Sequence, residues 1–182
     1  MSEELNARIP GGDAEALRAE ALGQPGKRRF RMLAAINGET HILWMEKQQL
    51  QALGLALEQL LEQLPDEPVI ASGEPLPGML DEDTRNQFRV GRIELAFDET
   101  LERIVIIAHD IEQDEDDERP TLAVRISRAQ ARSLSAEAAH VVAQGRPRCP
   151  MCGSPMDPEG HVCPQQNGHL PLTLQDEEPG LP

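Results

Sequence analysis

The stretch RRFRMLAAINGETHILWMEKQQLQALGLALEQLL, residues 28–61, predicts a β-hairpin that is followed at once by a helix. Its first segment, Arg28–Ile36, is strongly apolar and ends at Asn37-Gly38. This dipeptide favours a two-residue hairpin turn, because both turn positions need a positive φ. Glu39–Met45 has the length and composition of the return strand. The stretch therefore indicates a fold that mixes antiparallel strands with helices.

The helix is expected over Glu46–Leu64, because its leucines recur at the spacing of one helical face: Leu50, Leu53, Leu57, Leu60, Leu61 and Leu64. Pro65 ends it, since proline cannot donate the hydrogen bond that a helix interior requires. On the other side of the hairpin, Gly23–Gly26 has the chemistry of a tight turn. The run Ala16–Leu22 before that turn is compatible with either a helix or a strand.

A second set of elements follows farther along the chain. Gln87–Phe97 alternates apolar and polar residues, with a slip of phase at Gly91 that predicts a β-bulge. Arg103–His109 and Thr121–Ile126 are predicted strands. Ser127 is suited to cap a helix that runs to about residue 143.

These elements predict an α+β domain over residues 16–144, with a largely antiparallel sheet and two helices on one face. Each half places a helix directly after paired strands, and Glu46–Gln49 occupies the position that Ser127–Gln130 has in the other half. The similarity indicates either an internal ββα duplication or two common α+β units. Residues 1–15 are expected to be a flexible N-terminus, residues 145–172 a zinc-binding module, and residues 173–182 a disordered acidic tail.

Composition narrows the classes of function. The 182 residues carry a formal net charge of −15, and the core must be aliphatic because there are three Phe, one Trp and no Tyr. A strongly acidic chain disfavours binding to nucleic acid and to anionic membranes, but it suits a basic protein partner. No apolar run approaches the roughly 20 residues of a membrane span. Met1–Asn6 lacks the apolar core of a signal peptide, so a cytoplasmic protein is expected.

All three cysteines lie within residues 149–163, beside histidines, which favours metal ligation over disulfides. Cys149 and Cys152 form a C-x2-C turn, and Cys163 adds a third thiol. Zn²⁺ prefers four tetrahedral nitrogen and sulfur ligands, so a histidine is expected to complete the set. Spacing allows His161, in the pattern C-x2-C-x8-H-x-C, or His169, in the pattern C-x2-C-x10-C-x5-H.

A closed Cys3His site of this kind is structural, because catalysis needs an open coordination position for water. The module also has no net charge and no aromatic residues, which argues against nucleic-acid binding. The expected cofactor is therefore one structural Zn²⁺.

Other candidate residues have simpler interpretations. Asp110–Glu118 is strongly acidic but has no glycine for the sharp turn of a cation loop, so a solvated hairpin loop is predicted. His109 ends a strand, where active sites occur, and is the one candidate position for catalysis. His41 and Trp44 face opposite ways along one strand and are predicted to be packing residues.

The chain resembles the bacterial family known as domain of unknown function 3090. The resemblance is carried by four stretches: Gly23–Phe30, Glu46–Gln49, Phe88–Gly91 and Gly145–Cys152, the last continuing through Asp157–Pro164 to Asn167-Gly168. It implies His161 as the fourth ligand, because the family keeps this histidine while the position of His169 can be aromatic. It also implies an accessory role near kinase-like and histidine-phosphatase-like proteins, but no activity. The chain departs from the family pattern at Arg31 and in its long polar N-terminus.

Three hypotheses of function follow. The first is a cytoplasmic interaction or adaptor protein that uses zinc structurally and binds a protein partner. The second is an enzyme, a hydrolase or nucleotide-acting protein, with its site near His109. The third is a zinc protein associated with nucleic acid. Sequence alone predicts neither catalytic residues nor an oligomeric state.

Overall fold

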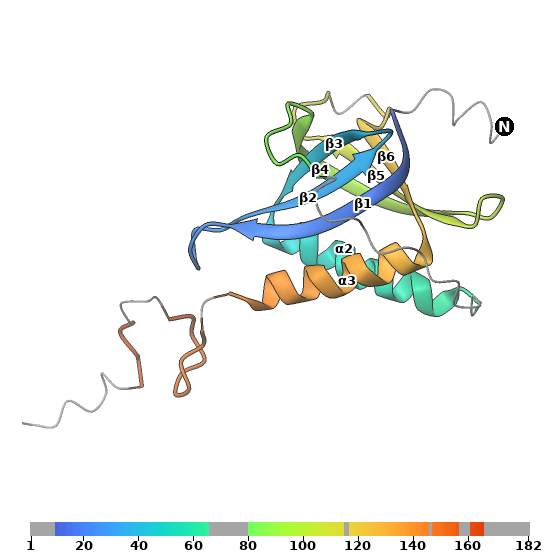
Figure 1. Cartoon of the computed structure of the whole chain (residues 1–182). Helices are drawn as coiled ribbons and strands as arrows, with labels where there is room; N and C mark the ends of the chain where they lie inside the picture. Colours follow the sequence, from blue (N-terminus) through green and yellow to red (C-terminus); the bar gives the residue numbers. More distant parts are fainter. Residues whose placement is uncertain (1–9, 66–79, 115–116, 146, 157–160, 166–182) are drawn as a thin grey trace, which may run out of the picture. The chain divides into compact units, whose positions relative to one another are not determined.

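The structure is a computed structural model that describes residues 10–65, 80–114, 117–145, 147–156 and 161–165 (Figure 1). The chain divides into two compact units, Met1–Gln144 and Gly145–Pro182, and each is considered by itself. The first unit contains all the named strands and helices. The predicted tail at residues 173–182 lies outside the described residues, as does most of the connecting segment between the two halves of the first unit.

The first half of this unit contains three strands and a helix: β1 (Gly11–Leu22), β2 (Arg29–Ile36), β3 (Glu39–Met45) and α2 (Lys47–Gln63). The second half repeats this order with β4 (Gln87–Asp98), β5 (Arg103–Asp110), β6 (Leu122–Ile126) and α3 (Arg128–Ala143). The α+β class and the two helices agree with the prediction. The undecided run before the first turn is a strand.

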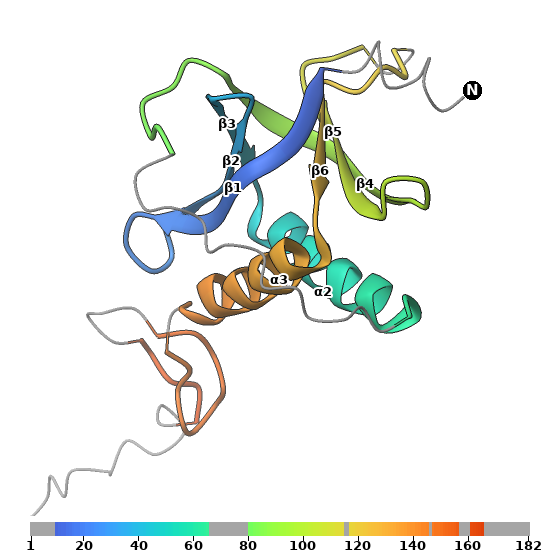
Figure 2. The same ribbon diagram turned by 45° about the vertical axis from the view of Figure 1, so that its right-hand side comes forward.

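The six strands form a closed barrel in the order β1-β2-β3-β4-β5-β6. Neighbours within each half are antiparallel, whereas β3 pairs with β4, and β6 with β1, in parallel. The sheet is thus mostly antiparallel, but the two parallel pairings close it, which was not predicted. In two views, α2 and α3 lie side by side below the barrel (Figures 1 and 2).

The expected flexible N-terminus is wrong for residues 11–15, which belong to β1. The backbone N–H of Ala123 donates to the carbonyl oxygen of Pro10 at 2.8 Å, so the chain is already paired with β6 at this point. Gly11 lies so near β6 that an added Cβ would be 1.8 Å from the carbonyl oxygen of Ala123. Gly11 permits this close approach because it has no Cβ. Residues 1–9 lie outside the described part.

Both predicted turns are confirmed. In the hairpin turn between β2 and β3, Asn37 has a φ of 51° and Gly38 a φ of 77°. Gly23 and Gly26 also have positive φ values, and the N–H of Lys27 donates to the carbonyl oxygen of Gln24 at 2.9 Å. These turns fix the register of β2 against its two neighbours in the first half.

The two halves share their irregularities as well as their order. The register between β1 and β2 shifts at Ala14/Ala16, and that between β4 and β5 shifts at Val90/Arg92. The predicted bulge at Gly91 is therefore present, and β1 has a counterpart. Each half is a βββα unit. The ββα unit expected from the sequence counted only the two strands that precede each helix. The duplication itself stays a prediction.

The core is aliphatic and continuous between barrel and helices. Buried side chains from β1 to β6 meet those of α2 and α3 in one cluster, which includes Met32, Leu43, Leu50, Leu53, Leu57, Ile104, Ile106, Val124, Ala131 and Leu134. The helices approach closely at Gly54, where an added Cβ would lie 3.1 Å from that of Ala138. The hydroxyl of Ser135 also donates to the carbonyl oxygen of Gly54 at 2.9 Å. Among the described residues, neither helix is long and apolar enough to cross a membrane.

Candidate metal centre

Residues 147–156 of the second unit form a compact hairpin around the C-x2-C motif. The N–H of Cys149 donates to the carbonyl oxygen of Ser154 at 2.8 Å, and the N–H of Gly153 returns to the carbonyl oxygen of Cys149 at 2.9 Å. Gly153 has a φ of 72°, a conformation that glycine adopts without steric cost. The N–H of Met156 donates to the carbonyl oxygen of Pro147 at 2.8 Å, and this contact closes the loop.

Cys149, Cys152, His161 and Cys163 converge, with their ligand atoms all within 4.8 Å of one another. The sulfurs of Cys149 and Cys163 are 3.9 Å apart, and the sulfur of Cys152 is 3.2 Å from Nε2 of His161. Cys149 and Cys163 are buried, whereas the other two residues are half-buried. The structure thus brings together four of the predicted ligands, while His169 lies outside the described residues.

The spacing of these atoms suits a tetrahedral ion. Zn–S bonds of about 2.3 Å at tetrahedral angles place two sulfurs roughly 3.8 Å apart. The 3.9 Å between Cys149 and Cys163 matches this spacing. A disulfide would need about 2.05 Å, and all three cysteines are free. The donor set, three sulfurs and one imidazole nitrogen, is one that Zn²⁺ prefers.

The surroundings of Cys152 favour its thiolate form. Hydrogen bonds from Ser154, first through its side chain and then through its backbone, lower the pKa of Cys152 to about 6, and His161 adds to the effect. A metal is bound by the thiolate and not by the thiol. Ser154 had not been singled out from the sequence. Its position two residues after the second cysteine, beyond a turn-forming glycine, was the available signal.

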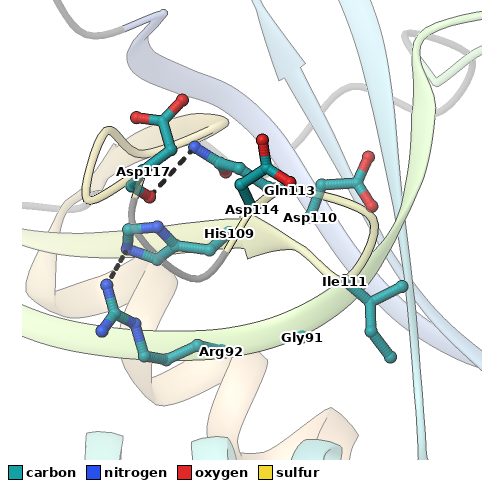
Figure 3. A pocket seen from close by; sticks show the side chains of 8 residues that line it. All are labelled: Gly91, Arg92, His109, Asp110, Ile111, Gln113, Asp114 and Asp117. Atoms are coloured by element: carbon teal, nitrogen blue, oxygen red, sulfur yellow. Dashed lines mark hydrogen bonds between the residues drawn. The ribbon is translucent and has the colours of Figure 1, made fainter.

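The candidate position for catalysis, His109, lines a separate pocket of about 360 Å³ in the first unit (Figure 3). The pocket forms where β4 bulges and β5 ends. Gly91 is required there, because an added Cβ would lie 2.9 Å from the Cα of Ile111. The remaining lining residues are mostly polar: Arg92, Asp110, Gln113, Asp114 and Asp117.

His109 is buried against the neighbouring strand. Its Nε2 lies 3.2 Å from an amino group of Arg92 and 3.5 Å from a carboxylate oxygen of Glu94. Figure 3 shows the guanidinium of Arg92 joined to the imidazole ring of His109 by this contact. The described residues that line the pocket include three aspartates but no serine or cysteine.

The acidic run after β5 is an ordered loop in the part that is described, which excludes residues 115–116. The side-chain amide of Gln113 donates to the carbonyl oxygen of Arg119 at 2.6 Å and accepts from the hydroxyl of Thr121 at 3.0 Å. Asp117 pairs with the Arg119 guanidinium, whose hydrogen bonds hold the pKa of that carboxyl well below its usual range. This loop joins two strands of a hairpin, as predicted.

The comparisons with known proteins address the family. A family described as protein of unknown function (DUF3090) matches residues 12–163. The chain belongs to this family. The DUF3090 match spans both the barrel and the cysteine-histidine cluster, and the resemblance expected from the sequence is confirmed. No curated protein and no solved structure matches the chain.

Proposed function

We propose that this DUF3090 protein is an interaction or adaptor protein whose C-terminal module is held together by one structural zinc ion. The observation that carries the proposal is the convergence of Cys149, Cys152, His161 and Cys163 within 4.8 Å. Four protein ligands complete a tetrahedral shell and leave no position for a substrate or water. The ion would therefore stabilise the module rather than perform chemistry.

Zinc would supply the stability that the small module lacks in apolar contacts. Among the described residues of the range 145–165, only the ligands Cys149 and Cys163 are buried. In modules of this size the binding of the metal largely is the free energy of folding. Free thiols also suit a reducing compartment, which supports the cytoplasm as the location.

Elemental analysis of purified, untagged protein tests the zinc site. We expect about one zinc per chain in the wild type, and loss of most of it in Cys163→Ser and in His161→Ala. Met151→Ala is the matched control, because Met151 lies in the same loop, is exposed and is not a ligand. Equal zinc content in His161→Ala and the wild type would mean that a residue other than His161 is the fourth ligand. Absence of any transition metal from the wild type would remove the proposed site.

The interaction role needs a separate test. We expect affinity purification of the full chain to recover a stoichiometric protein partner that Cys163→Ser fails to retain. The net charge of −15 favours a partner with a basic surface, so the complex should weaken as salt is raised. A partner retained equally by Cys163→Ser would place the interaction outside the zinc module. Salt-sensitive binding of RNA or DNA in place of a protein would favour the nucleic-acid alternative.

An enzyme with its site at His109 is the second candidate function. One observation favours it: a pocket of about 360 Å³ is lined by a buried imidazole that contacts Arg92. Hydrolysis of chromogenic phosphate and carboxylate esters tests this function. Turnover that is lost in His109→Ala and kept in His140→Ala would support an enzyme. Equal rates in these two variants would exclude this pocket as the site.

A further inference from the structure

A basic pocket of about 350 Å³ lies where β2 begins and β3 ends. Phe30 and Met45 also border it, but their side chains belong to the buried core on the other face of the sheet. Its remaining lining is polar or aromatic and is drawn from four elements or their ends: Arg28, Arg29, Trp44, Glu46, Lys47 and Arg89. Cations therefore dominate the polar lining of this pocket.

The register of the barrel gathers the cations on one face. Arg31 on β2 pairs with Trp44 on β3, and Trp44 pairs in turn with Arg89 on β4. Paired residues share a face of the sheet, and so do alternate residues of one strand, which adds Arg29. The guanidinium of Arg29 lies 3.9 Å from the centre of the Trp44 ring. This cation–π contact holds the Arg29 guanidinium beside the ring at the pocket.

The pocket has an excess of positive charge in an acidic protein. Four cations and one carboxylate line it, which leaves a net charge of +3 where the whole chain has −15. Glu46 pairs with Arg89 at 2.8 Å, so the single carboxylate is already engaged. Within the described part of the chain, neither Arg29 nor Lys47 lies within 4.0 Å of a carboxylate. Clustered cations without counter-ions repel one another, and a bound anion would remove this cost.

The N-terminus of helix α2 adds to the positive potential at this pocket. Lys47 is the first residue of the 17-residue helix α2, so the positive end of the helix dipole lies at the pocket. The first turn of α2 contains no acidic residue, and the carboxylate of Glu46 at the N-cap offsets only part of this positive potential. The corresponding place in the second half differs, because Arg125, which matches Trp44, pairs there with Asp13 at 3.2 Å. The anion-attracting arrangement therefore belongs to the first half.

We propose that this pocket binds the phosphate group of a small phosphorylated molecule, with Arg29 and Lys47 as its principal contacts. Arg29 presents a planar set of donors that suits phosphate oxygens, and Lys47 adds a mobile charge. Arg28 donates to the carbonyl oxygen of Gln144, which positions a further cation at the rim. The site is distinct from both the metal centre and the His109 pocket.

Titration of the full chain with inorganic phosphate and pyrophosphate tests the proposal. Trp44 is the only tryptophan and there is no tyrosine, so intrinsic fluorescence reports directly on this pocket. We expect a saturable change with pyrophosphate that sodium chloride at equal ionic strength does not produce. Calorimetry provides a second reading, which is needed because changing Arg29 alters the surroundings of Trp44 itself.

The variants Lys47→Gln and Arg29→Gln are each expected to weaken pyrophosphate binding at least tenfold. Arg103→Gln is the matched control, because Arg103 begins β5 as Arg29 begins β2 and carries the same charge. Its affinity should stay within twofold of the wild type. Circular dichroism establishes that all the variants are folded.

Three results would overturn the proposal. One is a response to pyrophosphate no larger than that to sodium chloride. Another is an equal loss of affinity in Arg103→Gln, which would indicate an effect of overall charge. The third is binding of a short single-stranded oligonucleotide without binding of pyrophosphate, which would assign the pocket to a polymer instead of a small ligand.

Discussion

The side-chain amide of Gln49 donates to the carbonyl oxygen of Val90 at 3.2 Å and so joins the first turn of α2 to the bulge of β4. Gln130 makes the corresponding contact in the other half, donating to the carbonyl oxygen of Ala14 at 2.8 Å beside the irregularity of β1. Each glutamine also accepts a hydrogen bond at 2.9 Å from the backbone N–H of the residue that caps its helix. One amide therefore caps a helix and ties it to a bulged strand of the opposite half.

Replacing either glutamine should destabilise the barrel. Gln130→Ala leaves both the capping N–H and the strand carbonyl without their partner, so we expect a loss of about 1–2 kcal/mol in the free energy of unfolding. Gln49→Ala should behave in the same way. Urea denaturation followed by Trp44 fluorescence measures both. Gln51→Ala, at an exposed position of α2, should change stability by less than about 0.5 kcal/mol. Equal effects at positions 49 and 51 would mean that these contacts contribute nothing to stability.

The close approach of the two helices at Gly54 predicts that added bulk is costly at this position but not at an exposed position of the same helix. Gly54→Leu places a branched side chain where even a Cβ would be 3.1 Å from Ala138, so overpacking should cost about 1–3 kcal/mol despite the better helix propensity of leucine. Ala52→Leu adds the same bulk to an exposed position of the same helix and should be nearly neutral. Thermal unfolding of the two variants compares these costs. A variant at position 54 as stable as that at position 52 would show that the helices can separate without cost.

Much of this architecture was predictable because local chemistry determines it. Asn37-Gly38 requires a hairpin turn, the leucine spacing requires an amphipathic helix, and Ser127 supplies a cap whose side chain accepts from the N–H of Gln130 at 3.1 Å. Barrel closure was not predictable from local pattern. It depends on parallel pairing of β1 with β6, two strands that are separated by about a hundred residues and joined by no turn signal.

The two candidate sites also differ in how far local sequence determines them. The metal centre could be predicted because its four residues lie within one short segment and their spacing has chemical meaning. The basic pocket could not, because Arg29, Lys47 and Arg89 belong to different elements and meet only when β3 and β4 pair. Trp44 was interpreted as a packing residue, and its contact with Arg29 depends on strand register rather than on any motif.

His41 should make the stability of the barrel depend on pH. Burial lowers the pKa of His41 below its ordinary value of 6.5, and Glu39 offsets only part of the effect. The unfolded chain therefore binds the proton more readily than the folded chain in the window just below pH 6.5. Stability from this residue is present above pH 6.5 and is lost as the pH falls through that window. His41→Gln should flatten the change in urea midpoint between pH 7.5 and 5.5. His140→Gln removes an exposed histidine and should leave the slope unchanged. If His41→Gln leaves the change in urea midpoint between pH 7.5 and 5.5 unaltered, His41 is not the source of the pH dependence.

Removal of the metal should unfold the C-terminal module without unfolding the barrel. The chain divides at Gln144, and the named strands and helices all lie before that point. The sole tryptophan, Trp44, lies within the first unit, so its fluorescence reports only on the barrel. A strong zinc chelator should therefore release about one zinc per chain while the barrel keeps its stability to within about 0.5 kcal/mol.

Proteolysis provides the second measurement, since cleavage within residues 145–165 should accelerate on chelation while the barrel stays protected. Met151→Ala should retain the zinc-dependent protection of the wild type, whereas Cys163→Ser should be cleaved rapidly with or without chelator. A parallel loss of Trp44 signal on chelation would mean that the barrel depends on the metal, and the two units would then fold as one.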